Sequence, residues 1–148
     1  MRFCVCICEE VGDENPFFSV IVPTRNRPEY IHDCIASVIN QVFMDFEIIV
    51  SDNSIDRPCL DIITNFEDKR IKYKKPEKAL GVCDNFEFAR RCACGKYILV
   101  LGDKQRLYKD ALKKIYEILS EEDADIVSFN MEMFSLFDSK NDGNGRNV

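Results

Sequence analysis

The chain has 148 residues, 46% of them hydrophobic, so it is long enough to bury the core of one domain. Its 26 acidic residues outnumber its 20 basic residues, and the net charge of -6 argues against nucleic acid as a partner, because phosphate backbones bind basic surfaces. No stretch approaches the ~18 consecutive apolar residues of a membrane-spanning helix, and the first ten residues lack the pattern of a signal peptide. We therefore expect a cytoplasmic protein.

The eight cysteines are expected to be reduced, because a disulfide framework needs an export route that this sequence does not indicate. Cys4, Cys6 and Cys8 alternate with apolar residues, which would place their thiols on one side of a strand. A metal site is one interpretation. Small thiols that are buried or tolerated are favoured instead, because zinc ligands usually come as Cys-x2-4-Cys pairs and the only histidine, His32, is distant in sequence.

Strand-like and helix-like segments alternate from residue 17 onward. Phe17 to Val22 is a short apolar run rich in β-branched residues and stops at Pro23, which predicts a strand. Between Ile31 and Val42 apolar residues recur at helical spacing, and Pro28 suits the first turn of that helix. Phe46 to Val50 predicts a second strand. The remaining predicted elements are a short helix at 60–66, a weak strand at 71–73, a helix at 85–94 that ends at Gly95, an apolar strand at 97–101, a helix at 111–119 and a last strand at about 125–130.

This alternation predicts the fold class. Strands that are apolar on both faces and are separated by helices indicate a mainly parallel sheet with helices on both faces, an α/β, Rossmann-like fold. We expect this domain to occupy residues 17–136, after an N-terminal extension of residues 1–16. Residues 137–148 are polar and glycine-rich and cannot contribute to a core, so we expect a disordered tail there.

Polar residues follow three of the predicted strands. The strings are PTRN at 23–26, SDNS at 51–54 and GD at 102–103. In an open parallel sheet the ligand lies outside the carboxyl ends of the strands, so these residues are candidates for a site. An Asp or Asn after a strand can simply form a turn or cap a helix, as Asp52 could. Three polar clusters at one end of one sheet nevertheless favour a binding site, because chance would scatter them over both ends.

These strings and their order resemble the family 2 glycosyltransferases with the GT-A fold. The similarity begins with SVIVPTRN at 19–26 and FEIIVSDNS at 46–54. It continues through Gly81 with Asn85, ACGKYI at 93–98 and LGD at 101–103. The resemblance covers roughly Phe17 to Asn130 and implies a nucleotide-sugar-binding domain.

The resemblance also implies roles for individual residues. Thr24 matches the residue beside the nucleotide base, and Pro23 shapes that turn. Asp52 matches the aspartate that accepts a hydrogen bond from the uracil N–H. Asp103 falls in the family's Asp-x-Asp region, whose carboxylates hold the ribose and a divalent cation, Mg²⁺ or Mn²⁺, that bridges the two phosphates. The candidate donor-binding residues are Pro23, Thr24, Arg25, Asp52, Asn85 and Asp103, with Asp103 as the candidate metal ligand.

The implied function is transfer of a sugar from a nucleotide-diphosphate donor, expected to be a UDP-sugar, to a glycan or lipid-linked acceptor in cell-surface polysaccharide synthesis. Peripheral association with the inner face of the membrane is part of this expectation. The family's catalytic base comes from a segment beyond the strand near Asn130, so we expect the acceptor-binding half to be missing and assign no base. The alternative is a nucleotide-binding fragment without turnover. A flavodoxin-like or receiver-type module is disfavoured, because the first predicted strand is followed by neither clustered acids nor Gly-x-Gly-x-x-Gly.

The Asp-x-Asp region departs from the family's pattern. Residues 102–106 contain one carboxylate, Asp103, and Lys104 or Gln105 stands where the metal-binding aspartate is expected. One interpretation is that Lys104 and Arg106 replace the metal and stabilise the diphosphate directly, which predicts metal-independent nucleotide binding. The other is that both are solvated loop residues in a protein that has lost its metal site.

Overall fold

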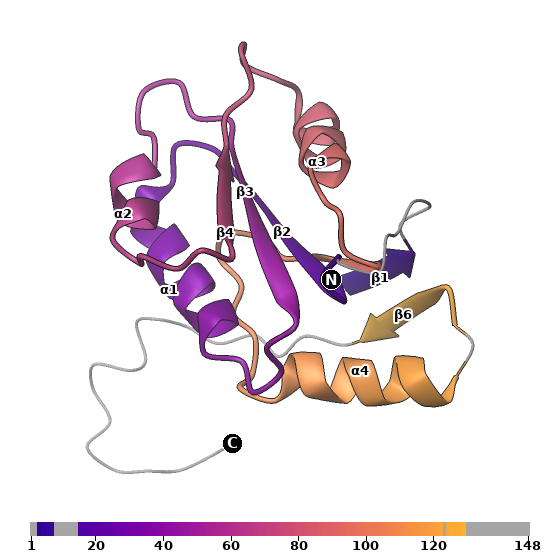
Figure 1. Cartoon of the computed structure of the whole chain (residues 1–148). Helices are drawn as coiled ribbons and strands as arrows, with labels where there is room; N and C mark the ends of the chain where they lie inside the picture. The colour runs from indigo at the N-terminus through magenta and orange to yellow at the C-terminus, as the bar shows by residue number, and fades with distance from the viewer. Residues whose placement is uncertain (1–2, 8–14, 123, 130–148) are drawn as a thin grey trace, which may run out of the picture.

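The computed structural model describes residues 3–7, 15–122 and 124–129, which form a six-stranded sheet in the order β4-β3-β2-β5-β1-β6 (Figure 1). The strands are β1 (Phe3–Ile7), β2 (Phe18–Thr24), β3 (Phe46–Asp52), β4 (Ile71–Lys74), β5 (Tyr97–Val100) and β6 (Ile126–Phe129). β4, β3, β2 and β5 run parallel, and β1 lies antiparallel between β5 and β6. The predicted α/β fold with a mainly parallel sheet is confirmed.

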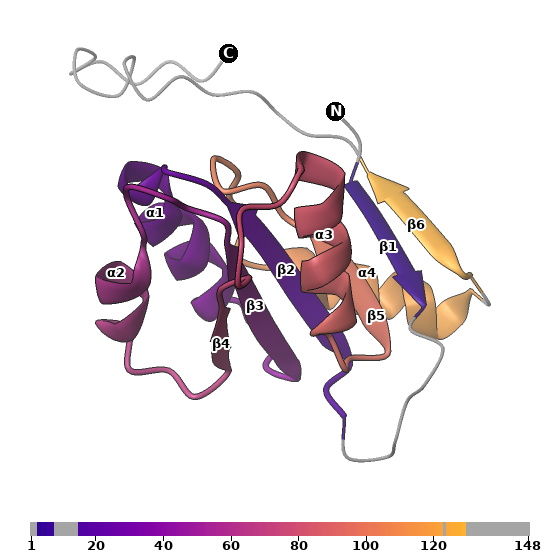
Figure 2. The same cartoon turned by 90° about the horizontal axis from the view of Figure 1, so that it is seen from above.

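Helices cover both faces of this sheet. They are α1 (Pro28–Ile39), α2 (Leu60–Thr64), α3 (Val82–Arg91) and α4 (Ala111–Glu121). Figure 2 shows α3 in front of the sheet and α1 and α4 behind it. Alternate residues of the central strands face the two sides, so Val20 and Ile48 pack with α1 and α4 while Ile21 and Ile49 pack against Ala89 of α3. This two-sided burial is why the strands are apolar at nearly every position.

The N-terminal segment contributes a strand to the sheet. Val5 pairs with Leu99 of β5 on one side and with Val127 of β6 on the other. Cys4 and Cys6 therefore lie in a strand, as their alternation predicts, whereas Cys8 lies outside the described residues. Residues 137–148, where we expected a disordered tail, also lie outside them.

The connection between α3 and β5 differs from the prediction in its details. The helix begins after Gly81 and ends at Arg91, about three residues earlier at each end than the apolar spacing indicates. Gly95 is therefore not the cap of this helix. Its backbone instead lies against β2, where its N–H donates to Ser19 Oγ at 2.8 Å. The same hydroxyl donates to the buried Glu47 of β3 at 2.5 Å, so Gly95 is linked to both β2 and β3 by hydrogen bonds.

Candidate functional site

Four loops meet at the carboxyl ends of the parallel strands. They connect β2 to α1, β3 to α2, β4 to α3 and β5 to α4, and the register places Thr24 at the end of β2 directly beside Asp52 at the end of β3. We call this edge the strand-end rim, made of residues 23–27, 51–59, 75–81 and 102–106. The rim contains every residue that the sequence singles out after a strand, because parallel strands all end on the same edge.

Thr24 and Asp103 contact each other across two neighbouring strands. The Thr24 hydroxyl donates to Asp103 Oδ2 at 2.8 Å, and both side chains are buried. Arg27 approaches the other carboxylate oxygen, with Nη1 3.4 Å from Oδ1, while 53% of its side chain stays exposed. Sequence reasoning missed Arg27. The signal available was a second arginine in the same loop as Arg25, directly before the helix-starting Pro28.

Asp52 is a buried anchor for the loop that follows it. Its Oδ1 accepts the backbone N–H of Ser54 at 2.9 Å. Its Oδ2 accepts the backbone N–H of Cys59 at 2.8 Å and the hydroxyl of Tyr73 at 2.7 Å. Burial favours the neutral acid, but these hydrogen bonds outweigh burial and lower the pKa of the Asp52 carboxyl. The turn-forming role that the sequence allowed for Asp52 is thus present, and its contact with a base remains a prediction.

The Asp52 carboxylate also acts on its two donors. Burial, together with the neighbouring negative charge, raises the pKa of the Tyr73 hydroxyl and of the Cys59 thiol well above their ordinary values. Both side chains therefore stay protonated at neutral pH and remain available as donors. Sequence reasoning assigned Tyr73 only to a weak strand and gave Cys59 no partner, because neither contact is encoded in local spacing.

Two asparagines join the rim loops to one another. Asn26 has a positive φ of 54°, and its Oδ1 accepts the backbone N–H groups of residues 55–57 at 3.1 to 3.4 Å. Asn53 exchanges two hydrogen bonds with the backbone of Leu80, at 2.8 and 2.9 Å. Lys75 Nζ donates to the Ser54 carbonyl at 2.7 Å. These contacts hold the first three loops in one arrangement before any ligand binds.

The other predicted site residues lie at different depths. Arg25 is exposed on the rim, with Nη1 3.5 Å from the Leu80 carbonyl. Pro23 is buried within β2. Asn85 is also buried, below the rim in α3, where its Oδ1 accepts the Ser51 hydroxyl at 2.6 Å. Asn85 therefore supports the end of β3 from beneath in this structure, and its role as a direct ligand remains a prediction.

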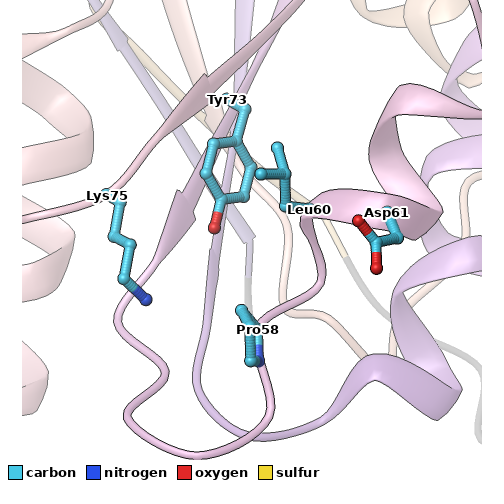
Figure 3. A pocket seen from close by; sticks show the side chains of 5 residues that line it. All are labelled: Pro58, Leu60, Asp61, Tyr73 and Lys75. Carbon is cyan, nitrogen blue, oxygen red and sulfur yellow. The ribbon is translucent and has the colours of Figure 1, made fainter.

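A pocket of about 240 Å³ opens between the loops after β3 and β4. It is lined by Asp52, Asn53, Ser54, Ile55, Lys75, Pro76, Glu77, Lys78 and Ala79. A second hollow of about 250 Å³ shares Lys75 and is lined mostly by apolar atoms of Pro58, Leu60, Asp61 and Tyr73. Figure 3 shows the Tyr73 hydroxyl pointing between Lys75 and Pro58, with Leu60 alongside its ring. The first pocket, which Asp52, Asn53 and Ser54 help to line, is the better candidate for a small polar ring.

The residues after β5 do not fit a divalent cation held by paired carboxylates. Gln105 Oε1 accepts the backbone N–H of Gly102 at 2.5 Å, and an amide offers no charge to a metal. Lys104 Nζ lies 4.6 Å from the centre of the Tyr30 ring, and Arg106 pairs with Asp33, so both cations are engaged with α1. Across the described ranges, the structure contains no group of three or more His, Cys, Asp or Glu side chains arranged to hold a metal ion.

An α/β sheet whose strand-end loops gather polar side chains around a pocket is the architecture of proteins that bind nucleotides at that edge. The sequence matches the pattern of "Glycosyl transferase family 2" over residues 19–143. The chain therefore belongs to the family 2 glycosyltransferases. None of the described helices is both long and apolar enough to cross a membrane.

Relatives and solved structures agree with this assignment. An uncharacterized glycosyltransferase of Methanocaldococcus jannaschii is 36% identical over 123 residues, which cover 79% of this chain and 42% of the relative. A GalNAc(5)-diNAcBac-PP-undecaprenol β-1,3-glucosyltransferase of Campylobacter jejuni is 34% identical, over 72% of this chain and 35% of its own. S. aureus TarS in complex with UDP is similar in structure, with a TM-score of 0.65, 30% identity and coverage of 70% of this chain and 32% of TarS. The chain thus spans less than half the length of these proteins.

Proposed function

We propose that the strand-end rim binds the nucleotide part of a UDP-sugar, in a glycosyl transfer to a glycan or lipid-linked acceptor. The observation that carries the proposal is the joining of Thr24 to Asp103 beside the pocket at Asp52. TarS, a structural neighbour at 30% identity, has been crystallised with UDP and with UDP-GlcNAc. The Campylobacter jejuni relative is named for a lipid-linked acceptor, which supports an acceptor of the same class for this chain.

In this proposal the donor lies across the ends of three strands. The uracil ring occupies the pocket between residues 52–55 and 75–79, whose volume of about 240 Å³ suits one small ring rather than a whole nucleotide. The ribose and diphosphate extend past Thr24 toward Asp103. Asp52 Oδ1 has one protein donor and keeps acceptor capacity for the uracil N–H. Since its side chain exposes no surface, that contact requires residues 54–55 to move when the base enters.

Such a site must stabilise the negative charge of the leaving group. A UDP leaving group carries two phosphates, so preorganised donors and cations aimed at the diphosphate stabilise its departure. Arg25 and Arg27 are the side chains of the β2–α1 loop that meet this need, whereas Thr24 donates its hydroxyl to Asp103. Asp52 and Asp103 both accept from donors of the protein, so neither is assigned as the carboxylate base for the acceptor.

Replacing Thr24 by valine tests the site. Valine keeps the shape but removes the hydroxyl that orients Asp103, so we expect UDP affinity to fall by about tenfold, as for loss of one hydrogen bond to a charged group. Isothermal calorimetry with UDP measures this loss. The matched control is Thr64→Val on the exposed side of α2, where the hydroxyl bonds only to its own helix, and UDP affinity should not change. Equal affinity of Thr24→Val and the wild type would contradict the proposed site.

Donor turnover is tested separately, by measuring the release of free sugar by the same protein. Release of free sugar from UDP-GlcNAc or UDP-glucose would show that the chain catalyses donor cleavage. UDP binding without release would favour the alternative, a nucleotide-binding unit without turnover.

A further inference from the structure

The carboxylate that should hold the metal is already paired with a cation of the protein. Asp103 Oδ1 lies 3.4 Å from Nη1 of Arg27, and Oδ2 accepts the Thr24 hydroxyl at 2.8 Å. Asp103 is buried, so both of its oxygens are directed into these contacts rather than toward solvent. A divalent cation requires several oxygen ligands, and both Asp103 oxygens already accept from donors of the protein, Thr24 and Arg27.

Lys104 or Gln105 stands where the family's pattern has its second carboxylate, and both side chains contact other parts of the protein. Gln105 Oε1 accepts the backbone N–H of Gly102, which closes the turn after β5. Lys104 and Arg106 contact Tyr30 and Asp33 of α1. The basic pair considered from the sequence is therefore directed at a helix. The charge beside Asp103 comes from the β2–α1 loop instead.

Arg27 has donors to spare for an anion. A guanidinium carries five N–H donors in a planar fork, and Asp103 takes one of them. The Arg27 side chain is 53% exposed, so a ligand can reach it from solvent. Arg25, in the same loop, reaches the other way to the Leu80 carbonyl beside the pocket. The two arginines of one loop thus contact two separate parts of the rim, the Leu80 carbonyl and Asp103.

We propose that Arg27, oriented by Asp103, takes the place of the divalent cation as the countercharge for the donor diphosphate, so that this chain binds nucleotide without metal. Guanidinium–phosphate pairs are strong because two parallel charged hydrogen bonds can form at once. The inference rests on the proposed function. It assigns Asp103 a positioning role for Arg27 in place of metal ligation.

Calorimetry of the full chain with UDP tests the inference in the presence of Mg²⁺ and in the presence of EDTA. We expect equal affinities in the two buffers. A fall of about tenfold or more on chelation would overturn the inference while leaving the proposed nucleotide site intact. If UDP does not bind in either buffer, the proposed function and the inference fail together.

The variant Arg27→Gln separates a phosphate contact from a structural role. We expect it to weaken UDP binding by about tenfold or more in both buffers, and to leave binding of uridine, which lacks phosphate, unchanged in an NMR titration. Arg27→Lys should be intermediate, because lysine keeps the charge and loses the fork. The control is Arg91→Gln at the far end of α3, where the arginine is exposed and paired with Glu87. Equal losses for UDP and uridine, or no loss for either, would overturn the role of Arg27.

Discussion

Asp52→Asn is expected to lower the free energy of unfolding by about 3 kcal/mol at pH 7. The amide nitrogen of the asparagine is a donor, and it would face a backbone N–H that donates to the carboxylate in the wild type. The affected donors are the N–H groups of Ser54 and Cys59 and the hydroxyl of Tyr73. Urea denaturation measures the change. The control is Asp56→Asn in the same loop, where the side chain is exposed and little change is expected.

The effect of Asp52→Asn should depend on pH in a defined direction. The pKa of Asp52 in the folded chain is lower than its ordinary value of 3.8. A carboxylate with a lowered pKa contributes its full stability above the unfolded pKa, and loses it as the pH falls through the folded pKa. The stability gap between wild type and Asp52→Asn should therefore be constant above about pH 5 and shrink below pH 3.8. A gap that is absent at pH 7 would show that Asp52 does not anchor the loop.

Gly95→Ala is expected to destabilise the fold by about 3 kcal/mol, at the upper end for an overpacked position. A Cβ at Gly95 would lie 2.6 Å from the Ser19 backbone nitrogen and 2.7 Å from the Phe18 carbonyl carbon, and neither can move without shifting β2. Thermal unfolding followed by circular dichroism measures the loss.

Gly81→Ala is the matched control for Gly95→Ala. A Cβ at Gly81 would meet Asp84 Oδ2 at 3.1 Å, and that atom is the end of a side chain that can rotate away. We expect a small effect. Comparable losses at the two glycines would contradict the explanation by backbone contact.

The central strands were predictable because each is a short apolar run bounded by polar or turn-forming residues. The strand predicted at Phe46 to Val50 is β3 in the structure, Phe46–Asp52. The strand predicted at Tyr97 to Leu101 is β5, Tyr97–Val100. The position of β1 was not predictable, because its pairing with β5 joins residues 90 or more positions apart and leaves no local pattern. α3 begins at Val82, three residues before the predicted start, and the Val82 side chain is exposed.

The candidate site was predictable in its location and not in its connections. Thr24, Asp52 and Asp103 follow strands, and strand ends can be identified from sequence. Some of their partners come from other elements. Tyr73 reaches Asp52 from β4, and Arg27 reaches Asp103 from the loop after β2, contacts that only the folded chain brings together. From the sequence, Lys104 and Arg106 were the basic residues considered as replacements for the metal. In the structure the basic residue that contacts Asp103 is Arg27.

The central claim is that UDP binds at the strand-end rim, and a titration of isotopically labelled protein with UDP tests it most directly by NMR. We expect backbone amide shifts to concentrate in residues 24–27, 52–55, 75–80 and 102–105, with the shifts at Arg25 and Arg27 reduced when uridine, which lacks the diphosphate, replaces UDP. Shifts that gather at the opposite edge around Glu47 and Gly95, or no shifts at saturating UDP, would contradict the account.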